Sequence, residues 1–174
     1  MEKPFADPVT AKILTFVSDI GLPVLRKALD DTTFLPGLAL EVGCIVVDED
    51  RLLYPGDILH EAGHLAVMSA EKRAQTQGQL VADGAEEMGA IAWSYAAAVH
   101  LGLDPAVLFH PAGYKEGAHS LRENFVAGRY IGVPYLQWLG LTLEPPRAAQ
   151  QGVPPYPHML RWLCGPATEC TASL

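Results

Sequence analysis

The segment GDILHEAGHLAVMSA, at residues 56–70, places three polar side chains that can do chemistry in an apolar setting. His60, Glu61 and His64 follow the pattern His-Glu-x-x-His. On an α-helix, residues four positions apart lie on one face, so both imidazoles can reach a single metal ion. Glu61 is rotated away from that line and can contact a metal-bound water instead. The spacing therefore predicts a metal site, with zinc as the favoured ion, one per chain.

The surroundings of this motif favour a metal over a purely structural role. Two histidines on a helix can also be hydrogen-bonded core residues or surface residues. Burying two imidazoles and a carboxylate is expensive unless something pairs them, and a metal ion is the most economical partner. The apolar frame that makes burial the expected state consists of Ile58, Leu59, Leu65, Ala66 and Val67.

A third ligand is expected because catalytic zinc sites have three protein ligands and one open position, whereas structural sites have four. Two adjacent acidic residues, Glu86 and Glu87, follow the motif at the start of an apolar helical stretch. Glu86 stands three residues after Asp83, which is the position of a capping-box glutamate. Glu87 heads the face that continues with Ala90. We therefore predict Glu87 as the third ligand and keep Glu86 as the alternative.

In the first half of the chain, capping residues and hydrophobic periodicity predict the elements that must position this site. We expect, in order, a helix after Asp7–Pro8 that stops at Gly21, a short helix over 23–30, strands over 38–47 and 51–54 joined by a turn at 48–50, and a motif helix that Asp57 caps and that ends near Ser69.

The second half predicts further short helices separated by turns. We expect a polar connection over 71–84, a long helix over 85–102 capped by Asp83, a short helix from Pro105, an irregular stretch over 110–119, a helix from Ser120 to near Gly128, a helix over 134–138, and an extended, proline-rich segment over 145–174.

Composition places these elements in one globular domain spanning residues 1–174. Hydrophobic residues make up 49% of the chain and charged residues 18%, which is typical of a packed protein. The expected class is α+β, predominantly helical, with a small β-hairpin before the motif helix. The net charge of -8 argues against general nucleic-acid binding. No uncharged apolar run approaches the roughly 20 residues of a membrane span.

The N-terminus and the cysteines predict a cytoplasmic protein. MEKPFADPVT has no apolar stretch of the kind found in secretory signals. Three cysteines without a Cys-x-x-Cys pair are most simply reduced thiols, although Cys164 and Cys170 are close enough in sequence to pair. Nothing in the sequence indicates an oligomeric state.

The motif and its neighbours resemble a known family. HEAGH followed by a helical glutamate resembles the gluzincin clan of thermolysin-like zinc metallopeptidases. The layout, with IVVDEDRLLYPGDILHEAGH followed by EMGAIAW, is closest to short bacterial members of the ImmA/IrrE type. The resemblance spans about residues 38–100. It implies that His60 and His64 bind zinc with Glu87 or Glu86, and that Glu61 is the general base.

The family also carries an aspartate four positions after its glutamate ligand, as a partner for a ligand histidine. Here Ala90 or Ile91 occupies that position, so a carboxylate from elsewhere or a backbone carbonyl must orient the histidine.

The predicted activity is hydrolysis of a peptide or another amide. In this prediction Glu61 moves the water proton to the leaving amine. Oxyanion donors are expected among Tyr114, His119 and Tyr130, which lie in or beside a glycine-rich stretch. The alternative is a non-enzymatic regulatory or partner-binding module on the same scaffold, with or without metal. Glu61 favours the enzyme, because a structural metal site has no need of it.

Overall fold

The structure is a computed structural model that describes residues 5–114 and 116–167. It confirms the predicted class: α+β and predominantly helical, with a three-stranded sheet. The elements follow one another as α1 (Pro8–Asp19), β1 (Val24–Arg26), β2 (Leu38–Glu41), β3 (Cys44–Val47), α2 (Pro55–Val67), α3 (Ala70–Ala74), α4 (Gly84–His100), α5 (Pro105–Leu108), α6 (Pro111–Tyr114), α7 (Gly117–Val126), α8 (Val133–Trp138) and α9 (Pro145–Gln151).

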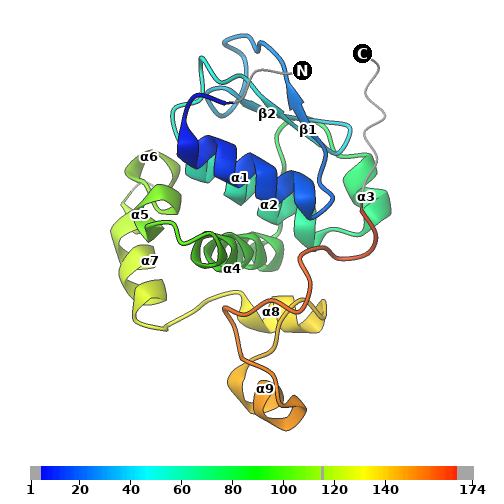
Figure 1. Cartoon of the computed structure of the whole chain (residues 1–174), viewed down its shortest axis with the longest axis vertical. Coiled ribbons are helices and arrows are strands. Elements are labelled where there is room, and N and C mark those ends of the chain that lie inside the picture. Colours follow the sequence, from blue (N-terminus) through cyan, green and yellow to red (C-terminus); the bar gives the residue numbers. More distant parts are fainter. Residues whose placement is uncertain (1–4, 115, 168–174) are drawn as a thin grey trace.

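The motif helix α2 lies in the middle of the layers. In Figure 1, the sheet lies above α1 and α2, α4 crosses below them, and α8 and α9 lie beneath α4. Ile58, Leu59, Ala62, Leu65 and Ala66 of α2 have no exposed surface. This burial anchors the whole motif helix, because its apolar residues face both the sheet side and α4.

The first helix begins and ends where the sequence indicates. The Asp7 carboxylate accepts a hydrogen bond from the Thr10 backbone N–H at 2.7 Å, and Pro8 occupies the first turn. Gly21 follows the helix with φ of +94°, a left-handed conformation that favours glycine.

The sheet departs from the prediction at two places. Residues 24–26, expected in a short helix, form β1 and pair in parallel with β3. Pairing with a distant strand here overrides the local helical pattern. The hairpin turn is at Val42–Gly43 and not at 48–50, so the predicted strand over 38–47 is itself the hairpin of β2 and β3, and residues 51–54 form no strand. Val42 and Gly43 both adopt positive φ, which suits a two-residue hairpin turn.

The start of α2 also differs from the prediction. Its N-cap is Tyr54, which makes no side-chain capping bond, and Pro55 opens the first turn. Asp57 is inside the helix, and its carboxylate contacts His110 instead of capping. The helix ends at Val67, close to the expected Ser69.

Among the later elements, α4, α5 and α8 lie where the sequence predicts them, and four segments differ. The stretch over 110–119, expected to be irregular, contains the one-turn helix α6. Part of the polar connection over 71–84 forms α3, which Ser69 caps through the Lys72 N–H at 3.2 Å. Helix α7 begins at Gly117, earlier than the expected Ser120.

The proline-rich segment is not extended over its first residues. Pro145 and Pro146 open α9, because proline suits the first turn of a helix, and Gly152 ends it in a left-handed conformation.

The cysteines differ from the prediction as well. Cys44 on β3 is disulfide-bonded, so the expectation of reduced thiols throughout is wrong. Cys164 is a free thiol, so it does not pair with Cys170, which itself lies outside the described residues. Within the part of the chain that the structure describes, no helix has the length and apolar character needed to cross a membrane.

Candidate metal centre

The two helices that carry the site approach each other closely at a glycine. A Cβ atom on Gly63 of α2 would lie 2.7 Å from the Ala90 carbonyl oxygen of α4. The Ser94 hydroxyl of α4 lies 3.0 Å from the Leu59 carbonyl oxygen, which ties the helices together at the same level. This close crossing holds the first turns of α4 against the histidine face of α2.

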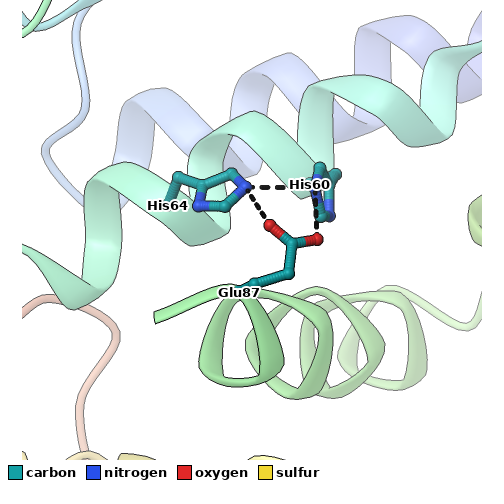
Figure 2. Close-up of side chains that lie close together, drawn as sticks. All are labelled: His60, His64 and Glu87. Atoms are coloured by element: carbon teal, nitrogen blue, oxygen red, sulfur yellow. Dashed lines mark hydrogen bonds and ion pairs between the residues drawn. The ribbon is translucent and has the colours of Figure 1, made fainter. Parts of the chain in front are cut away.

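His60, His64 and Glu87 come together at this crossing, as Figure 2 shows. The two Nε2 atoms of the histidines are 3.1 Å apart. The Glu87 carboxylate bridges them, with Oε1 at 3.4 Å from His60 Nε2 and Oε2 at 3.2 Å from His64 Nε2. These are the only described residues that form such a group of three possible metal ligands.

Glu86 points to a different neighbour. Its carboxylate forms an ion pair with Lys72 of α3 at 2.6 Å, while its backbone N–H donates to the Asp83 side chain at 2.9 Å. The predicted cap of α4 by Asp83 is therefore present. Of the two glutamates, the structure places Glu87 in the cluster and Glu86 outside it.

The donor atoms fit a small divalent cation. Ligands at about 2.1 Å from a tetrahedral zinc ion are roughly 3.4 Å from one another. The separations in this cluster are 3.1, 3.2 and 3.4 Å, close to that value before any rearrangement. Two imidazoles and one carboxylate also suit other first-row divalent ions, so the geometry supports a metal without selecting zinc.

The protonation states favour cation binding. Burial lowers the pKa of His60 to about 4, which keeps its imidazole neutral near neutral pH. The hydrogen bond from His64 lowers the pKa of Glu87, which favours its carboxylate form. Neutral imidazoles and an ionised carboxylate are the forms that bind a metal.

The outer nitrogens of the two histidines have different surroundings. His60 Nδ1 lies 3.1 Å from the hydroxyl of Tyr114 on α6, and burial raises the pKa of that phenol so that it stays neutral. Tyr114 is therefore the hydrogen-bond partner of the outer nitrogen of His60. His64 Nδ1 is buried and has no hydrogen-bond partner among the described residues.

Glu61 is beside the cluster without belonging to it. Burial raises the pKa of its carboxyl group from 4.5 to about 7, and the negative charges of Asp57 and Glu87 act in the same direction. A carboxyl group with a pKa near neutral pH is suited to take up and release protons.

A cleft of about 720 Å³ opens over the site. Its floor includes His60, Glu61, His64 and Glu87, and Tyr114 lies at one side. The rest of the lining comes from the β1–β2 connection, β2 and the loop after α3. It mixes polar side chains such as Lys27, Asp30 and Glu41 with apolar ones, among them Phe34, Leu35, Leu38, Leu40 and Leu80. The side chains of a bound molecule can therefore contact an apolar surface while its polar group faces the histidines.

The other two predicted oxyanion donors lie elsewhere. His119 on α7 is exposed and lies 3.4 Å from Glu123, one turn further along the same helix. The ring of Tyr130 packs against Phe125 and Tyr156. Neither His119 nor Tyr130 lines the cleft, so only Tyr114 of the three is at the site.

A buried polar pair next to the site was not predicted. Asp57 Oδ1 and His110 Nε2 are 2.7 Å apart, and the Tyr54 ring stacks on His110 with centroids 4.1 Å apart. The sequence holds one indication of this pair: Asp57 lies about one turn before His60, on the same face of the motif helix. Because Asp57 was expected to cap the helix, no buried partner was predicted for it. Nothing in the sequence connects Asp57 with His110.

Comparison of the chain with protein-family models, with curated proteins and with solved structures gives no match. The resemblance to gluzincins therefore stays a prediction carried by the motif and its layout.

Proposed function

We propose that this protein is a zinc-dependent hydrolase that cleaves a peptide or another amide bond. The observation that carries the proposal is the convergence of His60, His64 and Glu87 on the floor of a cleft, with Glu61 lining the same cleft outside the ligand group. Three protein ligands leave a coordination position open, as catalytic sites require.

In this proposal, each residue has a separate task. A bound zinc ion would polarise the substrate carbonyl and acidify a water molecule. Glu61 would take a proton from the water as its oxygen bonds to the carbonyl carbon, and would deliver that proton to the amine nitrogen as the C–N bond breaks. With the ring proton of His60 on Nδ1, the Tyr114 hydroxyl would accept a hydrogen bond from it, and the O–H of Tyr114 would remain available as a donor toward the cleft. The apolar side chains of the cleft lining, such as Phe34 and Leu80, bind substrate side chains.

Elemental analysis of the purified, untagged protein is the first test, and it should find one zinc ion per chain. Peptide mixtures and simple amides are then incubated with the protein, and new amines are detected by mass spectrometry. Glu61→Gln should keep the metal and lose hydrolysis by at least about a hundredfold, within the usual range for an acid–base residue. Glu123→Gln, on exposed α7, is the matched control and should behave as wild type.

Two outcomes would oppose the proposal. If elemental analysis of the wild-type protein finds no stoichiometric metal, the proposed metal site does not exist. Metal bound equally by wild type and Glu61→Gln, with no turnover by either, favours the non-enzymatic, partner-binding alternative.

A further inference from the structure

The segment that carries Tyr114 contacts α2 through two polar pairs one turn apart. His110 bonds to Asp57 at 2.7 Å, and Tyr114 bonds to His60 at 3.1 Å. Asp57 and His60 are three residues apart on α2, and His110 and Tyr114 are four residues apart around α6. Because each pair of residues spans about one helical turn, the two contacts lie on matching faces of α2 and α6.

The hydrogen bonds around His110 define its tautomer. The Gly113 backbone N–H donates to His110 Nδ1 at 3.1 Å, so this nitrogen is the acceptor. The proton of the neutral ring is then on Nε2, which donates to Asp57. Both side chains are buried, so this bond is shielded from water.

Apolar packing already attaches the segment of α5 and α6 to α2 without the Asp57–His110 pair. A Cβ atom on Gly56 of α2 would lie 2.0 Å from the Val107 carbonyl oxygen, so α5 already packs directly on α2. Leu108 and Phe109 are almost fully buried and add apolar contact. Apolar packing alone leaves the position of α6 along α2 and its rotation undefined. A directional hydrogen bond from His110 to Asp57 fixes both.

We propose that the Asp57–His110 pair positions Tyr114 and, through it, the imidazole of His60 in the metal centre. His110 is thus a positioning residue that contacts neither metal nor substrate. The inference rests on the proposed metal site, and it adds that the orientation of its first ligand depends on a residue outside that site. Partners that orient ligand histidines contribute about 10–100-fold to metal affinity.

The test compares two substitutions of His110 that each keep one of its bonds. The amide of Gln reaches the place of Nε2 and can still donate to Asp57, whereas the amide oxygen of Asn takes the place of Nδ1 and keeps only the bond from Gly113. Zinc affinity is measured by chelator competition. His110→Asn and Tyr114→Phe should each weaken it about 10–100-fold, and His110→Gln should stay within a few-fold of wild type.

A double-mutant cycle decides whether His110 acts through Tyr114. The variant with both His110→Asn and Tyr114→Phe should bind zinc no more weakly than Tyr114→Phe alone, because both changes remove the same support. Cobalt-substituted protein should show the same altered visible absorption in both single variants. The proposal is wrong if the two losses of zinc affinity multiply in the double variant. It is also wrong if His110→Asn binds zinc as tightly as wild type.

Nitrogen NMR of metal-free protein separates this proposal from that of the metal centre. The His60 Nδ1 signal should shift alike in His110→Asn and Tyr114→Phe and stay unchanged in His110→Gln, whether or not the chain binds zinc. An unchanged signal in His110→Asn opposes the positioning role alone. If that variant does not fold, wild-type protein still gives an answer, since a proton on His110 Nδ1 in place of Nε2 would contradict the proposed hydrogen bonds.

Discussion

The two ends of the histidine motif are held in different ways. At the His60 end, the hydroxyl of Tyr114 bonds to the outer ring nitrogen of the histidine. At the His64 end, the outer nitrogen has no partner among the described residues, and the ring is only 5% exposed. Gly63, the neighbour of His64 in sequence, lies at the close crossing of α2 and α4. A hydrogen bond thus supports the outer nitrogen of one ligand, whereas the other ligand has only burial and close helix packing on that side.

This difference implies that the two ligands depend on different parts of the chain. The His60 end depends on α6, a helix of one turn, whereas the His64 end depends on the long, buried helix α4. A buried nitrogen without a partner costs about 1–3 kcal/mol. The packing around His64 must offset that cost, so changes in packing should affect this end most.

The largest effect is expected from removing either histidine. His60→Ala and His64→Ala should each abolish stoichiometric zinc, measured by elemental analysis after dialysis, because two remaining ligands hold zinc weakly. His119→Ala, at an exposed position, is the control and should retain the metal. A protein with both His60→Ala and His64→Ala that still holds one zinc ion per chain would place the site elsewhere.

Glu87 contacts both histidines, so its loss should affect the two ends equally. Glu87→Ala should weaken zinc binding by at least about a hundredfold in chelator competition, because losing a ligand costs at least as much as losing a partner that orients a ligand, which is about 10–100-fold. Glu86→Ala removes a partly exposed ion pair with Lys72 and should change stability by under about 1 kcal/mol without altering zinc affinity. The reverse order would identify Glu86 as the ligand.

Glu61 should make the metal-free protein less stable as the pH rises. Its pKa is raised from 4.5 to about 7 in the folded state, so the folded state binds more protons than the unfolded state between these values. Stability therefore falls from about pH 4.5 to 7, by up to about 3 kcal/mol at roughly 1.4 kcal/mol per unit. Glu61→Gln removes this loss. Denaturant unfolding in EDTA should show the variant gaining over wild type with rising pH. A constant difference would mean that Glu61 is not desolvated.

The smallest of the four effects concerns the packing at the His64 end. Gly63→Ala forces α2 and α4 apart, because the added Cβ would lie 2.7 Å from the Ala90 carbonyl oxygen. The cost of overpacking, about 1–3 kcal/mol, exceeds the gain of up to about 1 kcal/mol from better helix propensity. Gly84→Ala is the matched control, since its Cβ would meet nothing within 4 Å. Equal unfolding free energies for the two variants would show that the crossing is not tight.

The sequence by itself determined the three longest helices and two of the three clustered side chains. Capping residues and helical periodicity are local properties, so α1, α2 and α4 could be predicted from short windows. His60 and His64 lie on the same face of α2 because of the helical repeat alone, since four residues make about one turn. The preference for Glu87 over Glu86 also came from a local argument, the capping position.

Only the tertiary structure decided what surrounds those side chains. Residues 24–26 form β1 because β3 offers hydrogen bonds that the local pattern cannot indicate. Tyr114 reaches His60, and His110 reaches Asp57, across more than fifty residues of chain. His119 and Tyr130, equally plausible by composition, point elsewhere. The physical reason is that backbone periodicity is set within a few residues, whereas the partner of a buried side chain depends on how distant helices cross.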